Sequence, residues 1–368
     1  VYVYSEDGTR YLDFTSGIGV LSLGYSHPAL VAALKDQAEK IWHCSNLFKI
    51  NKQRVVAEKI AKNSFADSIF FCNSGAEATE TSIKAARKFH HDLGFKNKNK
   101  IITFQGAFHG RTLASLFAAN NESHIKGFGP KVDGFINVPF ADHEALHNAI
   151  DDSVAAIMVE TILGEGGIKV IPKECLVGLR KICDERNILL ILDEVQCGIG
   201  RTGKFFAFEW PKIEPDIVPI AKGIGGGFPL GACLLNKKVS KCMSVGTHGS
   251  TFGGNPLAMS VANIVLDHIL KKDFLGHVQK VGDYLKKRLD EEIIKSFPSL
   301  IEEVRGKGLM LGIKPKISNE IIIDQMRKEK ILTVKASDNI IRLLPPLILQ
   351  NSHVDEAIEK IKKALSKI

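Results

Sequence analysis

Between about residue 69 and residue 235, short continuous apolar runs alternate with segments that have the periodicity of amphipathic helices. Because the apolar residues of these runs are continuous rather than alternating, they predict strands covered on both faces, as in a parallel sheet. The runs are IFFCN (69–73), KIITFQ (100–105), VAAIMVE (154–160), ILLILDE (188–194), IVPIAKG (217–223) and PLGACLLN (229–236). The sequence therefore predicts an α/β fold with a mostly parallel central sheet.

The pattern changes after about residue 256, where two long helical stretches precede short strands and a final helix. This order is typical of a smaller α+β domain. The first residues, YVYSEDGTRYLDF, predict a hairpin with Asp7 and Gly8 at its turn, and we expect this hairpin to pack beside the C-terminal part. We therefore expect a large domain at 37–267 and a small domain formed by 1–36 and 268–368.

Composition excludes several classes of protein. No run approaches the roughly 18 uninterrupted apolar residues of a membrane helix. The seven cysteines form no CxxC pair, which favours reduced thiols and a cytoplasmic location. The net charge of +8 comes from dispersed lysines, so solvated helix faces are favoured over a nucleic-acid surface. The chain begins in Val-Tyr-Val-Tyr, which is typical of the middle of a strand, and we expect a native segment before Val1.

The segment SGAEATE (74–80) directly follows a predicted buried strand and opens a helix. Ser74 and Glu77 have the spacing of a capping box, so a well-capped helix is one interpretation. The small residues Gly75 and Ala76 also leave the first N–H groups of the helix accessible. A helix N-terminus of this kind binds anions through its N–H groups and its dipole, so a phosphate site is the second interpretation.

Two charged residues lie where predicted buried strands end. Asp193 ends ILLILD, where ligands of open α/β sheets bind, and a buried carboxylate there needs a cationic partner such as a protonated pyridine nitrogen. Lys222 ends IVPIAK and is followed by glycines; burial would lower its pKa and make it a nucleophile. A strand-end cap and a surface lysine are the alternatives.

Together, the helix start, Asp193 and Lys222 are the parts that a pyridoxal-phosphate site requires. Other motifs are weaker. GIGRTGKF (198–205) has the spacing of a phosphate loop, but Phe205 stands where a magnesium-binding Ser or Thr belongs. GIGGG (223–227) has no helical pattern after it. We expect His90, His91 and the histidines of DHEALH (142–147) to be surface positions, and we predict no metal site.

With these motifs in place, the chain resembles the class III, ornithine-type pyridoxal-phosphate aminotransferases, and most closely their acetylornithine group. The resemblance covers nearly the whole chain, from LDFTSGIGVLSLGYSHP (12–28) to NIIRLLPPL (339–347). Its motifs are NSGAEATE, FHGRT, GEGG, LDEVQCGIGRTG, AKGIGGGFPLGA and STFGGNPLA. The resemblance implies the fold-type I architecture and a homodimer whose active sites lie at the subunit interface.

The resemblance also implies roles for individual residues. Lys222 would carry pyridoxal 5′-phosphate as a Schiff base and move the proton, and Asp193 would pair with the pyridine nitrogen. The other implied cofactor contacts are Ser74, Gly75, Ala76, Phe108, His109, Val195, Gln196 and, from the partner subunit's chain, Thr251. The implied substrate contacts are Arg111, Glu165, Arg342, Asn46 and Ser250. Glu165 would pair with Arg342 while the amino donor occupies the site.

The implied reaction is transamination between N2-acetylornithine and 2-oxoglutarate, as in arginine biosynthesis. Succinyl-diaminopimelate, as in lysine biosynthesis, is the first alternative substrate, followed by ornithine and 4-aminobutyrate. A cofactor-binding regulator without turnover is the alternative from another class. The chain departs from the family pattern at Leu21, at Thr161 and Leu163 in ETILGEGG, and at Phe48 and Lys49 in SNLFK.

Overall fold

The computed structural model describes all 368 residues and has a large seven-stranded sheet at its centre. Across the sheet the strands are β3 (Ser68–Cys72), β11 (Gly231–Leu235), β10 (Ile217–Ile220), β9 (Leu189–Asp193), β6 (Val154–Glu160), β4 (Lys100–Phe104) and β5 (Phe135–Val138). Neighbouring strands from β10 to β5 are parallel, whereas β11 is antiparallel to both β10 and β3. The predicted α/β fold with a mostly parallel sheet is confirmed.

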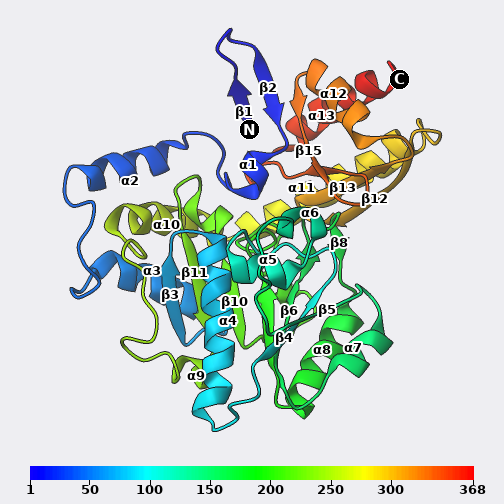
Figure 1. Cartoon of the computed structure of the whole chain (residues 1–368). Helices are drawn as coiled ribbons and strands as arrows, with labels where there is room; N and C mark the ends of the chain where they lie inside the picture. The colour runs from blue at the N-terminus through cyan, green and yellow to red at the C-terminus, as the bar shows by residue number, and fades with distance from the viewer.

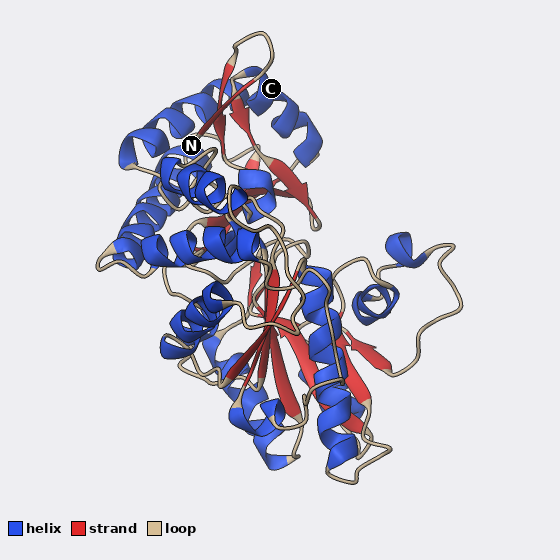
Figure 2. Ribbon diagram, turned by 90° about the vertical axis from the view of Figure 1, so that its left-hand side faces the viewer, coloured by secondary structure: helices blue, strands red, loops and turns tan.

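Both faces of this sheet are covered by helices, which explains its continuous apolar strands (Figure 2). In β6, Ala156 and Met158 point into the apolar cluster that includes residues of α4 (Gly75–Asp92), whereas Ile157 and Val159 point into the cluster on the opposite face. Successive side chains of a strand point to opposite faces, so burial on both sides favours apolar residues at consecutive positions. The second face is covered by α8 (Lys173–Glu185) and α10 (Pro256–Ile269).

Most of the other elements in the part of the chain that forms the large sheet connect its strands. The helices there are α3 (Asn51–Lys62), α5 (Leu113–Ala119), α6 (Glu122–Ile125), α7 (His143–Ala149) and α9 (Lys237–Ser240). A two-stranded sheet is formed by β7 (Ile162–Leu163) and β8 (Lys169–Val170). Short 3₁₀ turns span Ala207–Glu209 and Lys222–Gly225.

A second, four-stranded antiparallel sheet lies in the C-terminal part of the chain. Its strands are β12 (Ile301–Lys307), β13 (Met310–Pro315), β16 (Ile340–Leu343) and β15 (Val334–Ala336). The accompanying helices are α11 (Phe274–Arg288), which continues as a π-helical segment at Leu289–Ile294, α12 (Asn319–Lys328) and α13 (Asn351–Leu365). The predicted strand pair at TVKAS and NIIRLLPPLI is thus confirmed as β15 and β16.

The N-terminal hairpin joins this C-terminal part, as the sequence predicted (Figure 1). Strands β1 (Tyr2–Tyr4) and β2 (Arg10–Asp13) pair antiparallel, and β2 also pairs with β14 (Ile331–Leu332). Gly8 has φ +81° in the connecting turn, a conformation that glycine adopts without strain. Helices α1 (Ser16–Gly19) and α2 (Pro28–Ala38) then lead the chain back to the large sheet. None of the helices combines the length and the hydropathy that crossing a bilayer requires.

One glycine fixes how closely the edge of the large sheet approaches the start of α4. Gly231 pairs with Cys72 in the β11–β3 ladder. A Cβ atom at position 231 would lie 2.2 Å from the carbonyl oxygen of Ser74, which is too close for any residue other than glycine. The backbone of Ser74, and with it the first turn of α4, can therefore lie this close to β11 only because residue 231 has no side chain.

We expect Gly231→Ala to destabilise the protein by about 1–3 kcal/mol, because the added methyl group must push the Ser74 backbone aside. The free energy of unfolding in urea measures this. Gly178→Ala is the matched control: a Cβ atom there meets nothing within 4 Å, and its place inside α8 predicts a gain of about 1 kcal/mol. Equal unfolding free energies for the two variants would show that the approach at Gly231 is not constrained.

Candidate functional site

A cavity of about 470 Å³ opens at the carboxyl ends of the parallel strands. Glu160 and Asp193 are the last residues of β6 and β9 and lie opposite each other in the ladder. Lys222 follows β10, and the N-terminus of α4 forms another wall. Ten of the predicted site residues line this cavity: Ser74, Gly75, Ala76, Phe108, His109, Arg111, Asp193, Val195, Gln196 and Lys222.

Lys222 does not end a strand, because β10 stops at Ile220 and Lys222 opens the 3₁₀ turn. That detail of the sequence interpretation was wrong. Lys222 has φ +48°, in the left-handed region that non-glycine residues rarely adopt. Such strained residues persist where the surrounding structure fixes them, and they cluster at functional sites. Burial, followed by the positive charge of Arg342, lowers the pKa of Lys222 to about 8.

Asp193 is a buried carboxylate with fixed partners. One oxygen lies 2.8 Å from Nδ1 of His109, and the other accepts the backbone N–H of Val195 at 3.0 Å. Burial opposes a charged His109, but the hydrogen bond and charge of Asp193, together with Glu160, raise the pKa of His109 above its ordinary value. The second ring nitrogen of His109 is buried without a partner. The pair therefore places a negative group, backed by a histidine, at the floor of the cavity.

Glu160 also lines the cavity, although sequence reasoning assigned it no role. Its two oxygens accept the backbone N–H groups of Phe108 (2.9 Å) and Gly164 (3.0 Å), so one carboxylate holds two loops of the site. Burial, and next the charge of Asp193, raise the pKa of Glu160 to about 7. The signal that identified Asp193, an acid at the end of a buried strand, applies equally to Glu160.

The first turn of α4 presents free N–H groups toward the same cavity. The hydroxyl of Ser74 caps the helix by accepting the N–H of Glu77 at 3.2 Å. The capping box predicted from sequence is displaced by one residue, because Glu77 accepts the N–H of Asn73 (2.5 Å) and not that of Ser74. The N–H groups of Gly75 and Ala76 have no acceptor within the protein. An anion at this helix start would satisfy both.

Arg342 lies at the edge of the cavity on strand β16 and is buried, with 2% of its side chain exposed. It donates to Gln196 Oε1 at 3.1 Å and forms an ion pair with Glu165 at 3.1 Å. Glu165 itself is 39% exposed. The buried cation is thus held against the cavity by an acid that can move into solvent.

Arg111 is the second guanidinium of the site and lies close to Phe108, its Cζ atom 5.5 Å from the centre of the Phe108 ring. It forms no ion pair with any carboxylate. Its polar contact is with His124 on α6, where Nη2 and Nε2 are 3.2 Å apart. Sequence reasoning missed His124, and nothing in the pattern of this loop would have identified it.

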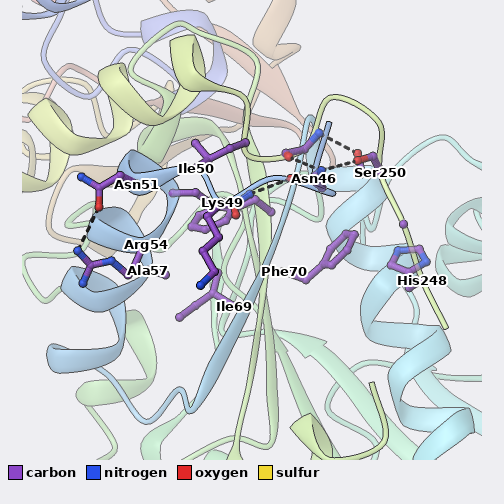
Figure 3. A pocket seen from close by; sticks show the side chains of 14 residues that line it. Asn46, Lys49, Ile50, Asn51, Arg54, Ala57, Ile69, Phe70, His248 and Ser250 are labelled. Atoms are coloured by element: carbon purple, nitrogen blue, oxygen red, sulfur yellow. Dashed lines mark hydrogen bonds between the residues drawn. The ribbon is translucent and has the colours of Figure 1, made fainter. Parts of the chain in front are cut away.

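Two further predicted site residues, Asn46 and Ser250, line a neighbouring pocket of about 620 Å³ instead of the cavity (Figure 3). The side-chain amide of Asn46 donates to the carbonyl oxygens of Ser250 (3.0 Å) and Gly253 (3.1 Å). The hydroxyl of Ser250 accepts from Asn73, which lines the main cavity, at 3.2 Å, so the two pockets adjoin. Thr251 is exposed next to Ser250. Asn46, Ser250 and Thr251 are therefore brought together with one another but not with Lys222.

No cysteine lines the cavity, and His109 is the one histidine that does. His90 is fully buried, with Nε2 2.9 Å from the carbonyl oxygen of Ala155, so its predicted surface position was wrong; His91 is exposed as predicted. His90 lies on the side of α4 that faces the sheet. An imidazole is tolerated at this buried position because it can form a hydrogen bond with the carbonyl oxygen of Ala155. All seven cysteines are free thiols.

Comparisons with known proteins show which family the chain belongs to. The family model for class-III aminotransferases matches residues 1–365. The acetylornithine aminotransferase of Agrobacterium fabrum is 50% identical over 368 residues, which cover 100% of this chain and 92% of that protein. The crystal structure of N-acetylornithine aminotransferase from Stenotrophomonas maltophilia has a TM-score of 0.87 and 35% identity, and the match covers 100% of this chain and 93% of that one.

A structure that is less similar in sequence contains the cofactor. The ornithine aminotransferase of Toxoplasma gondii, with partial occupancy of pyridoxal phosphate at its active site, has a TM-score of 0.95 and 31% identity, covering 100% of this chain and 88% of that one. The family match spans almost the entire chain. The protein belongs to the class-III aminotransferases, enzymes of fold type I that transfer amino groups with pyridoxal phosphate.

Proposed function

We propose that this enzyme transfers the terminal amino group of N2-acetylornithine to 2-oxoglutarate, giving N-acetylglutamate semialdehyde and glutamate. The observation that carries the proposal is the pair of guanidiniums beside Lys222: Arg111 without an ion pair, and Arg342 paired with Glu165 at 3.1 Å. Relatives that are 44–50% identical are named acetylornithine aminotransferases, which supports the same substrate here and a role in arginine biosynthesis.

The cavity residues fit pyridoxal phosphate. The unpartnered N–H groups of Gly75 and Ala76 suit its phosphate, and Ser74 holds that helix start in place. Asp193, backed by His109, suits a protonated pyridine nitrogen, while Phe108, Val195 and Gln196 line the space where the ring would lie. When bound, the cofactor supplies an electron-withdrawing ring that stabilises negative charge on the substrate carbon.

Lys222 has the properties of both a nucleophile and a proton carrier. With a pKa of about 8, about a tenth of its side chain is a neutral amine at pH 7, far more than for an ordinary lysine. We assign Lys222 two roles: it would hold the cofactor covalently, and as a free amine it would move a proton from the substrate's terminal amino carbon. Lys222 has a left-handed backbone conformation and opens a 3₁₀ turn, so its amine extends from a backbone with a defined conformation.

Arg342 and Glu165 form a switch between the two half-reactions. An arginine fork binds a carboxylate in two parallel hydrogen bonds, so Arg342 suits the α-carboxylate of glutamate or 2-oxoglutarate. While Glu165 occupies Arg342, the site presents one free guanidinium, Arg111, to a substrate with one carboxylate. When a dicarboxylate enters, the partly exposed Glu165 can leave and Arg342 becomes available.

The neighbouring pocket supports a homodimer. Large apolar side chains are exposed around it, at Trp42 (64%), Leu47 (90%), Phe48 (68%) and Phe252 (60%). Such a concentration of exposed apolar surface is typical of a protein–protein interface. We infer that a second copy covers this face and that Thr251 reaches the cofactor phosphate of the partner subunit, with Asn46 and Ser250 shaping the substrate channel.

The location and the domain division are also proposals. Seven unpaired thiols support a reducing, cytoplasmic compartment. The division into a large domain at 37–267 and a small domain at 1–36 and 268–368 is supported by the two sheets, since the large sheet uses only strands between Ser68 and Leu235 and the four-stranded sheet only strands after Ile301.

Turnover of amino donors with 2-oxoglutarate tests the substrate. We expect N2-acetylornithine to be the best donor, ahead of succinyl-diaminopimelate, ornithine and 4-aminobutyrate. Glu165→Gln should slow the half-reaction with N2-acetylornithine at least tenfold more than the half-reaction with 2-oxoglutarate, because a neutral amide leaves Arg342 uncompensated only while the monocarboxylate is bound. Single-turnover absorbance changes of the cofactor resolve the two half-reactions.

A higher kcat/KM for another donor would contradict N2-acetylornithine as the substrate. Equal effects of Glu165→Gln on both half-reactions would contradict the proposed switch but leave the substrate assignment unchanged. Glu174→Gln is a suitable control, because Glu174 is an exposed acid in the first turn of α8.

The lowered pKa of Lys222 predicts a pH dependence for cofactor uptake by the apoprotein. The neutral amine is the reacting form, so its fraction rises about tenfold per pH unit below the pKa and levels off above it. We expect the rate of covalent uptake to rise from pH 6, to reach half of its maximum near pH 8, and to level off about one pH unit higher. Borohydride trapping followed by mass measurement of the chain records the covalent product.

N-acetyl-lysine with free pyridoxal phosphate is the control, since its ordinary amine should keep gaining reactivity above pH 8. Peptide mapping should place the trapped product of the parent on Lys222, and Lys222→Ala should lose this product and keep only the slower trapping at surface lysines. A protein rate that follows the control up to pH 10 would contradict a lowered pKa at Lys222.

Complementation between variants tests the shared site. Lys222→Ala damages a subunit's own site, whereas Thr251→Val damages the site of its partner. Hybrid dimers of the two variants should therefore contain one intact site, and random pairing should restore about a quarter of the parent activity. Activity of co-expressed, separately tagged subunits measures this.

The control pairs Lys222→Ala with Asp193→Asn, both of which damage a subunit's own site, and no recovery is expected. A mixture of Lys222→Ala and Thr251→Val that is no more active than the sum of its components would place Thr251 in its own subunit's site or outside any site.

A further inference from the structure

Arg111 and Arg342 are held in the site by partners of different charge. Arg342 is buried and is neutralised by Glu165 at 3.1 Å. Arg111 has no carboxylate within ion-pair distance, and its one side-chain hydrogen-bond partner is the imidazole of His124 at 3.2 Å. One guanidinium must lose a carboxylate before it can bind substrate, whereas the other is already free.

His124 is placed by a small cluster at the mouth of the cavity. Its ring lies edge-on to Phe108, with 6.2 Å between the ring centres, and Arg111 lies over the same Phe108 ring at 5.5 Å. Phe108 is in turn fixed through its backbone N–H by the buried Glu160. The contact between His124 and Arg111 is therefore supported by a part of the site that is anchored to β6.

The contact determines the protonation state of His124. A guanidinium only donates hydrogen bonds, so Nε2 of His124 must accept and the ring is neutral with its proton on Nδ1. Burial, followed by the charge of Arg111, lowers the pKa of His124, and the opposing charge of Glu165 is smaller. The imidazole thus orients Arg111 without neutralising it.

We propose that His124 is a positioning residue for the substrate carboxylate, which holds Arg111 toward the cavity with its positive charge uncompensated. The inference rests on the proposed role of Arg111 in carboxylate binding. An arginine side chain loses considerable rotational freedom when it is fixed, so an arginine that is already oriented binds its carboxylate more tightly. A carboxylate at position 124 would orient Arg111 equally well but would compete with the substrate.

The test uses two substrates that differ only in the group that Arg111 binds. N-acetylputrescine is N2-acetylornithine without its carboxylate, so its turnover does not depend on Arg111. In the holoenzyme, His124→Leu should raise the KM for N2-acetylornithine about tenfold with kcat nearly unchanged, because a hydrogen bond to a charged group is lost. The kcat/KM for N-acetylputrescine should stay within about twofold of the parent value.

Two further variants separate positioning from a general structural effect. The side-chain oxygen of His124→Gln can accept the Arg111 N–H near the position of Nε2, so this variant should restore most of the affinity for N2-acetylornithine. His147→Leu removes an exposed histidine on α7 and should behave like the parent. Equal losses for both substrates in His124→Leu, or a His124→Gln variant as weak as His124→Leu, would overturn the proposal.

Binding of glutarate separates this inference from the proposed substrate. Glutarate has the two carboxylates of 2-oxoglutarate but no keto group, so it binds without reacting. We expect His124→Leu to raise its dissociation constant about tenfold by calorimetry, whatever amino donor the enzyme prefers. Unchanged glutarate binding would contradict the role of His124 even if N2-acetylornithine proves to be the substrate, and weakened binding would support it even if another donor is preferred.

Discussion

Burial of acids at the carboxyl ends of parallel strands is the constraint on which the rest of the site depends. Asp193 and Glu160 are adjacent in the β6–β9 ladder and almost fully buried, which would be strongly unfavourable without partners. His109 and the N–H of Val195 compensate Asp193, and the N–H groups of Phe108 and Gly164 compensate Glu160. Each compensating bond fixes a loop, so satisfying the buried charges also positions the groups that face the cavity.

The same argument explains why Arg111, which lines the cavity, and Arg342, which lies beside it, have partners of different charge. Arg342 comes from β16 in the C-terminal part and is buried, so it requires a nearby negative charge, which Glu165 provides. Arg111 is exposed and remains charged in contact with solvent, so a neutral imidazole is enough to orient it. The two side chains are identical, so the difference in burial decides their behaviour. Arg342 can bind a carboxylate only after Glu165 has left it, whereas Arg111 is available to a carboxylate at all times.

Much of the fold could be predicted from sequence because strands buried on both faces have continuous apolar patterns. The strand β5 was missed, since FINV is short and only partly buried. Asp193 was predictable as a strand-end acid, and Lys222 was identified although its strand stops two residues earlier. Glu160 carried the same signal as Asp193 and could have been found. His124 could not, because its contact with Arg111 depends on how a loop folds back over Phe108, and loop geometry leaves no periodic trace in the sequence.

The positions at which the chain departs from the family pattern show where its specificity can differ. Thr161 donates to the buried Glu194 at 2.9 Å, and Leu163 is 1% exposed within the main core, so both departures are absorbed inside the protein. The side chain of Leu21 packs over Gly227. A Cβ atom at position 227 would lie 3.0 Å from the Leu21 side chain. Lys49, by contrast, lines the open pocket beside the site, and Phe48 is largely exposed (Figure 3). These two departures therefore lie on the surface that the proposed dimer would bury, whereas the other three pack within the protein.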